Sequence, residues 1–78
     1  MKSMMIDFLN RVYEWAEWYG KDYKDVERYR EQAFGAVQFF NTLDESFDVS
    51  GEDRAYIRRM WENRYRQMFW ELMLKKTQ

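Results

Sequence analysis

The chain has 78 residues and a formal net charge of −1, and it contains no histidine, cysteine or proline. The missing residue types exclude a disulfide framework, a thiolate nucleophile, an imidazole base and every metal site built on cysteine or histidine. A chain of this length forms one domain at most. Disorder is not expected, because the composition is 46% hydrophobic and close to neutral.

The hydropathy and the first seven residues indicate whether the chain has a membrane span or a signal peptide. No apolar run approaches the roughly 20 residues that a membrane span needs. The first seven residues, MKSMMID, meet a charge at once and contain no small-residue cleavage site. We therefore expect no signal peptide, no membrane contact and a cytoplasmic location.

The first apolar stripe predicts a helix over residues 4–19. Ser3 is its expected N-cap, and Gly20 is expected to end it in the left-handed conformation. Apolar residues that recur at i, i+3, i+4 and i+7 mark the expected core face. They are Met5, Phe8, Leu9, Val12, Trp15, Ala16 and Tyr19.

The second stripe predicts a helix over residues 22–43. Its core face contains two alanines, which would let a neighbouring helix come close: Val26, Tyr29, Ala33, Ala36, Val37 and Phe40. Gly35 lies on the opposite side. A glycine inside a helix costs about 0.5–1 kcal/mol relative to alanine. We therefore expect a kink at Gly35 or the close approach of another backbone.

The third stripe predicts a helix over residues 51–75, after a loop at 44–50. Ser50 precedes an acidic first turn, and the segment 50–53 resembles a capping box. Lys75 suits the negative end of the helix dipole. The expected core stripe is Ile57, Met60, Trp61, Tyr65, Met68 and Leu72. Together the three helices predict an all-α fold. It is a single three-helix bundle, up-down-up, with a long C-terminal helix, in one domain over residues 1–78.

Several large apolar side chains fall outside these stripes. Residues 68–74 are apolar nearly all round the helix axis, and three helices cannot surround one of their own. The rings outside the stripes exceed the few hundred Å² of apolar patch that monomers usually expose. We therefore predict a surface for a protein partner or a second copy, with Arg59 and Arg66 as its polar rim. Its apolar residues are Trp18, Phe34, Phe39, Phe69, Trp70, Met73 and Leu74.

Catalysis and metal binding find little support in the sequence. The paired glutamates at 14 and 17 and at 27 and 31 fall on expected solvent faces, with nothing to desolvate them. The acidic loop that begins at Asp44 resembles a calcium loop, but Val49 and Ala55 occupy the positions where that loop needs Gly and Glu. We predict no enzyme, no small-molecule substrate, no cofactor and no metal.

Nucleic-acid binding is the alternative function. The third helix combines arginines with aromatic residues, which suit phosphates and bases. The arginines are Arg54, Arg58, Arg59, Arg64 and Arg66, and the aromatics are Tyr56, Trp61, Tyr65, Phe69 and Trp70. Two observations argue against nucleic-acid binding: the arginines are spread around the helix, and the isoelectric point is about 5.4.

The charge is uneven along the chain, with a net of −6 over residues 1–53 and +5 over residues 54–78. Antiparallel helices of opposite charge explain this distribution, and an acidic decoy surface for a basic groove is a second explanation. Our principal prediction is a non-enzymatic protein–protein interaction module. It would be a homodimer, or a small accessory, regulatory or inhibitory protein of the kind that phages and other mobile elements carry.

Overall fold

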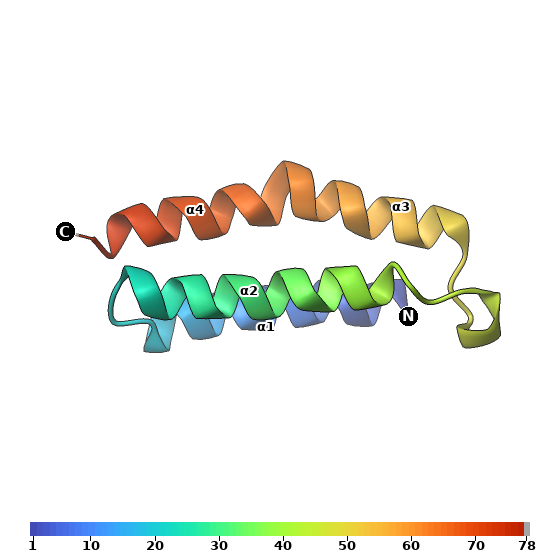
Figure 1. Ribbon diagram of the computed structural model, residues 1–78, viewed down its shortest axis with the longest axis horizontal. Helices are drawn as coiled ribbons and strands as arrows, with labels where there is room; N and C mark the ends of the chain where they lie inside the picture. Colours follow the sequence, from blue (N-terminus) through green and yellow to red (C-terminus); the bar gives the residue numbers. More distant parts are fainter. Residues whose placement is uncertain (78) are drawn as a thin grey trace.

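The computed structural model describes residues 1–77, and within them the chain is helical and has no strand. Three helical rods lie side by side, and the bundle measures 45 × 19 × 16 Å (Figure 1). The elements in chain order are α1 (Lys2–Tyr19), α2 (Tyr23–Phe40), the 3-10 turn η1 (Glu45–Phe47), α3 (Gly51–Met60), the π turn η2 (Trp61–Tyr65) and α4 (Arg66–Lys75). The last three form one long rod, so the expected all-α three-helix bundle is confirmed.

Local side chains fix most of the helix ends. The Asp22 carboxylate accepts a hydrogen bond from the Asp25 amide at 2.9 Å, and the Ser50 hydroxyl accepts one from the Asp53 amide at 3.1 Å. The expected cap at Ser3 is wrong, because α1 already begins at Lys2 and has no side-chain cap. Each observed cap satisfies a backbone donor that the helix itself leaves unpaired.

The second helix ends at Phe40, three residues before its expected end. The side-chain amide of Asn41 donates to the Val37 carbonyl at 2.8 Å, and the Thr42 hydroxyl donates to the Phe39 carbonyl at 2.7 Å. Each of these two carbonyls also accepts a backbone amide, so the side chains add a second hydrogen bond at the last turn, where the chain leaves the helix.

The core runs along the centre of the bundle, and its contacts are partly aromatic. The ring of Phe69 lies 5.5 Å from that of Tyr13, edge to face, and 6.0 Å from that of Trp61. The hydroxyl of Tyr65 donates to Asn10 of α1. Burial raises the pKa of the Tyr65 hydroxyl, which keeps this donor protonated. The third rod is thereby held on the Asn10 and Tyr13 side of α1.

The π turn η2 sets which face of α4 is buried. Ile57, Trp61, Tyr65, Phe69 and Met73 are all buried and recur every four residues. In a regular α-helix each four-residue step rotates by about 40° past a full turn, which adds up to about 160° over this stretch. The wider i→i+5 turn at 61–65 rotates less per residue and offsets part of this drift.

Because of this π turn, the buried face of α4 differs from the core stripe predicted from the sequence. Phe69 and Met73 were expected on the surface but are buried, with 0% and 2% of their area exposed. Met68, expected in the core, is only partly buried. The prediction was wrong because it applied a constant rotation of about 100° per residue through a segment that is not α-helical.

The first helix buries a narrower face than expected. Met5, Leu9, Val12 and Ala16 are buried as predicted. The other three residues of the expected stripe are exposed to solvent, at 37% for Phe8, 41% for Trp15 and 67% for Tyr19. They lie on a side of α1 that no other rod covers, so their assignment to the core was wrong.

Gly20 and Gly35 have different surroundings. Gly20 has an ordinary φ of −75°, so the expected left-handed conformation is wrong. A Cβ at Gly20 would lie 2.4 Å from the Ala16 carbonyl oxygen, which explains the glycine by lack of space. A Cβ at Gly35 would meet no atom of the chain within 4 Å, and α2 runs through it unbroken.

Replacing each glycine by alanine should therefore have opposite effects. Gly20→Ala should lower the free energy of unfolding by about 1–3 kcal/mol, because the helix end must shift to admit the methyl group. Gly35→Ala should raise it by about 0.5–1 kcal/mol through helix propensity. Urea denaturation followed by circular dichroism measures both changes, and a Gly20→Ala protein as stable as the unaltered chain would contradict the contact.

The π turn makes a second prediction. Deleting the exposed Asn63 should convert η2 into a regular turn and leave the buried face of α4 in place. We expect the free energy of unfolding to stay within about 1 kcal/mol.

The matched control is deletion of the exposed Glu31 from the middle of α2, a regular helix. This deletion rotates one half of α2 by about 100° relative to the other half. It should lower the free energy of unfolding by at least about 3 kcal/mol. Equal losses from the two deletions in urea denaturation would show that η2 is not a one-residue adjustment of register.

Candidate protein-interaction surface

The nine residues selected from the sequence do not form one surface. Phe69 and Met73 belong to the core. Phe34 is 39% exposed and stacks on Trp61, with the ring centroids 5.5 Å apart, so it covers the core. The remaining six residues are exposed, and they lie on separate parts of the bundle.

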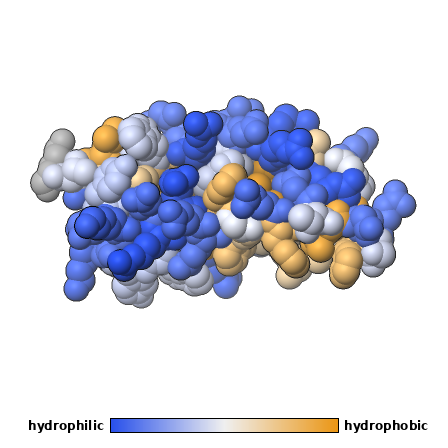
Figure 2. All heavy atoms as spheres, in the orientation of Figure 1, coloured by the Kyte–Doolittle hydropathy of each residue, from blue (hydrophilic) through white to orange (hydrophobic). Residues whose placement is uncertain are grey.

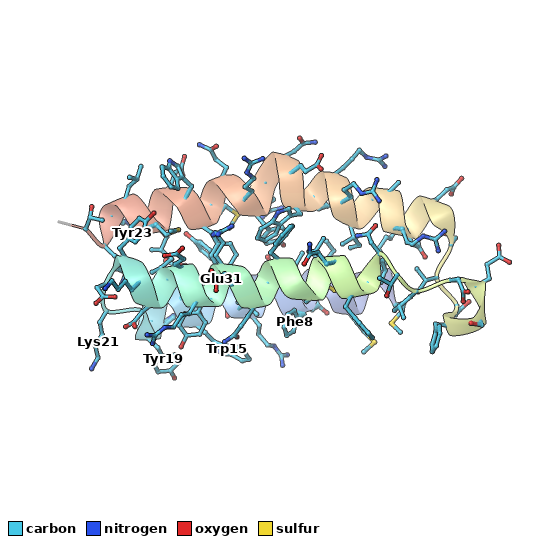
Figure 3. The ribbon with its side chains drawn as sticks, in the orientation of Figure 1. Phe8, Trp15, Tyr19, Lys21, Tyr23 and Glu31 are labelled. Carbon is cyan, nitrogen blue, oxygen red and sulfur yellow. The ribbon has the colours of Figure 1, made fainter. Side chains whose placement is uncertain are left out.

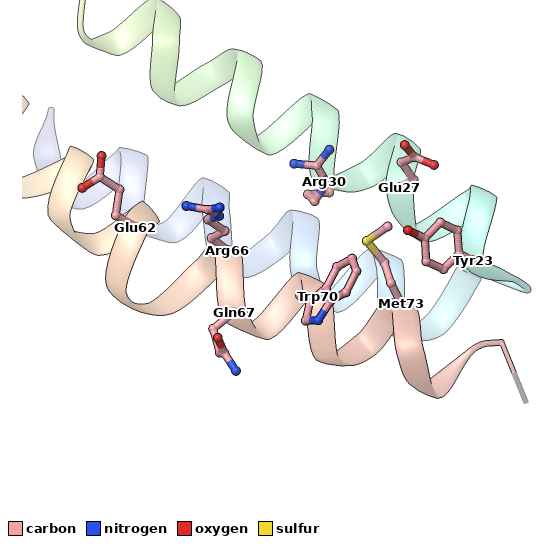
Figure 4. Close-up of a pocket in the computed structure, with 8 residues that line it drawn as sticks. All are labelled: Tyr23, Glu27, Arg30, Glu62, Arg66, Gln67, Trp70 and Met73. Carbon is pink, nitrogen blue, oxygen red and sulfur yellow. The ribbon is translucent and has the colours of Figure 1, made fainter.

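Trp70 and Arg66 line an open groove between α2 and α4 (Figure 4). Trp70 is half exposed and stands beside Met73, which lies against the bundle. The groove holds about 560 Å³ and also contains Glu27, Arg30 and Glu62. Acidic and basic side chains therefore alternate across it, and Trp70 is its main apolar contact.

Leu74 and Arg59 lie elsewhere on the third rod. Leu74 is 48% exposed and lines a small groove with Tyr13 and Lys75. Arg59 lies at the other end, beside Tyr56, whose ring centroid is 4.6 Å from the Lys2 amino nitrogen. The exposed residues predicted on the third rod therefore lie in three separate places.

A larger apolar surface lies on α1 and the adjoining end of α2. We call it the outer face, and it consists of Met1, Met4, Phe8, Trp15, Trp18, Tyr19 and Phe39. Figure 3 shows Phe8, Trp15 and Tyr19 projecting from α1 on the side away from α3 and α4. Trp18 is the most exposed residue of the set, at 83%. Of these seven residues, only Trp18 and Phe39 were selected from the sequence.

An apolar groove occupies one end of the outer face. It lies where α1 begins and α2 ends, and hydrophobic atoms gather there in Figure 2. The groove holds about 250 Å³, and every side chain that lines it is apolar: Met1, Met4, Met5, Phe8, Ala36, Phe39, Phe40 and Leu43. The other end of the same α1–α2 face is polar, with Asp25, Arg28 and Gln32 beside Tyr19.

The outer face is large for a protein of this size. Its exposed fractions add up to about four whole side chains, or on the order of 800 Å² at about 200 Å² each. The largest apolar patch on a typical monomer covers about 300–600 Å². The outer face therefore exposes more apolar area than the largest patch on a typical monomer.

A signal for the outer face was present in the sequence. Residues 1, 4, 8, 11, 15 and 18 follow alternating spacings of three and four, and all but Arg11 are Met, Phe or Trp. This is the spacing of a helix seam that packs on another helix. The buried residues of α1, at 5, 9, 12 and 16, form a second seam with similar spacing.

The arrangement gives little support to nucleic-acid binding. Trp61, Tyr65 and Phe69 are buried, so three of the five aromatic residues considered for base stacking are not accessible. Arg54 donates to the Leu43 carbonyl at 2.7 Å and so closes the loop before α3. Tyr56 and Trp70 remain, near opposite ends of the third rod.

The acidic loop also has a structural explanation. Asp44 accepts hydrogen bonds from the backbone amide of Ser46, at 3.0 Å, and from its hydroxyl. These bonds, that of the Ser46 hydroxyl above all, hold the pKa of the Asp44 carboxyl below its ordinary value. Within residues 1–77, no group of three or more acidic side chains is arranged to hold a metal ion.

No protein-family model, curated protein or solved structure matches the chain. In residues 1–77, none of the helices combines the length and the apolar character needed to cross a membrane.

Proposed function

We propose that the protein is a non-enzymatic protein–protein interaction module that works through its outer face. The observation that carries the proposal is the exposure of the two tryptophans of α1, 41% for Trp15 and 83% for Trp18, on the same side as the apolar groove. Tryptophan is among the residues most enriched at the energetic centres of protein interfaces.

The chemistry of the surface favours a helical partner. The exposed residues at 4, 8, 15 and 18 of α1 present a straight apolar ridge beside α2, and a helix laid along that ridge would contact both α1 and α2. Arg11 on the ridge and the acidic residues Asp7 and Glu14 beside it would fix the register of the partner. The module thus acts by presenting a surface, as an accessory, regulatory or inhibitory protein does.

Photo-crosslinking tests this function. Trp18 is replaced by the photoreactive p-benzoylphenylalanine, and the protein is irradiated in the cells that naturally express it. We expect covalent adducts with protein at this position, because the group reacts with atoms in direct contact. The matched control carries the same residue at Asn63, which is exposed on the third rod.

Adducts at position 18 that clearly exceed those at position 63 would support the proposal. No adduct at position 18, or equal labelling at both positions, would contradict it. Mass spectrometry of the adduct identifies the partner as this chain or as a different protein.

A further inference from the structure

The outer face contains both halves of a self-complementary contact. The groove lined by Met1, Met4 and Phe8 lies at one end of α1, and the indoles of Trp15 and Trp18 project at the other end. From this placement we infer that the occupant of the outer face is a second copy of the chain. The two copies pack α1 against α1 in antiparallel order, and each inserts its indoles into the groove of the other. This inference rests on the proposed function.

The spacing of the face fits a two-fold axis. The positions 1, 4, 8, 11, 15 and 18 map onto themselves when the helix is reversed, so that 1 meets 18, 4 meets 15 and 8 meets 11. The axis then passes between Phe8 and Arg11. One two-fold contact uses the same patch on both copies and closes without leaving a free edge.

The residue types favour the antiparallel order over the parallel one. Antiparallel packing places Met1 and Met4 against the indoles of the second copy, and methionine sulfur packs well against aromatic rings. Arg11 meets Phe8 of the second copy, where a guanidinium over a ring is favourable. Parallel packing would instead place Arg11 against Arg11, with repulsion between like charges.

The charges beside the face add a second reason. Asp7 precedes Phe8, so the antiparallel register brings Arg11 next to Asp7 of the second copy, twice about the axis. Within residues 1–77 the only ion pair is Arg28 with Asp25, at 3.8 Å, so neither Asp7 nor Arg11 has an ionic partner among these residues. The second copy supplies the partner of each.

The area of the face matches what a stable dimer needs. Standard protein interfaces bury about 800 Å² on each partner. The outer face leaves an apolar area of that order uncovered. Burying it would therefore give a specific dimer without help from other surfaces of the bundle.

Analytical ultracentrifugation of the purified chain tests the inference over a wide concentration range. We expect a dimer for the unaltered chain and a dissociation constant at least about tenfold higher for Trp18→Ala. The control is Trp70→Ala, on the half-exposed tryptophan of α4, which should leave the dissociation constant within about twofold. Circular dichroism checks that each variant remains helical.

A charge exchange tests the register. Asp7→Arg and Arg11→Glu should each weaken the dimer, because each places like charges at both ends of the contact. Mixing the two variants should restore a dimer that contains one copy of each, because both contacts then join opposite charges. A mixture that associates no more than its components would overturn the antiparallel register.

The outcomes separate the inference from the proposed function. If the unaltered chain is monomeric at every concentration, the occupant is not a second copy, while adducts formed at position 18 with a different protein still support the interaction module. A dimer that survives Trp18→Ala and is lost with Trp70→Ala places the interface between α2 and α4 and overturns the inference. A dimer weakened by Trp18→Ala alone supports both.

Discussion

Helix α1 has two apolar seams, and the other two rods of the bundle can cover only one of them. The rest of the structure depends on this constraint. Met5, Leu9, Val12 and Ala16 face α2 and the third rod and are buried. The second seam, which includes Met4, Trp15 and Trp18, faces solvent, and Trp18 is 83% exposed. Apolar surface that stays exposed adds nothing to the stability of one chain, and we propose that a partner covers this ridge.

The third rod decides which side of α1 stays free. Its buried residues recur every four positions from Ile57 to Met73, and the π turn at 61–65 keeps them on one side. The rings of Phe69 and Tyr65 then contact Tyr13 and Asn10 of α1. Because these contacts hold the third rod on that flank, the opposite flank, with Trp15 and Trp18, remains uncovered. The register of one helix and the exposure of another are thus linked.

Local signals predicted the helices well, whereas the surface required knowledge of the packing. The caps at Asp22 and Ser50 depend on residues three positions away, so the sequence is sufficient to find them. No residue between 61 and 65 is a sequence signal for a π turn. A constant α-helical rotation per residue therefore placed Phe69 and Met73 on the exposed side of the helix, although both are buried. Phe8, Trp15 and Tyr19 were assigned to the core because one wide apolar arc of α1 was taken for a single face. The exposure of Trp18, Phe39, Trp70 and Leu74 was predicted correctly, whereas their positions relative to one another follow only from the packing of the helices.

An isotope-filtered nuclear Overhauser experiment on an equal mixture of labelled and unlabelled chain can show directly whether the outer face joins two copies. It detects only proton pairs that lie in different molecules. The antiparallel dimer should give cross-peaks between the methyl group of Met4 in one copy and the indole protons of Trp15 and Trp18 in the other. The absence of such cross-peaks at concentrations where the chain is dimeric, or cross-peaks that involve Trp70 instead, would contradict the assignment of the outer face as the interface.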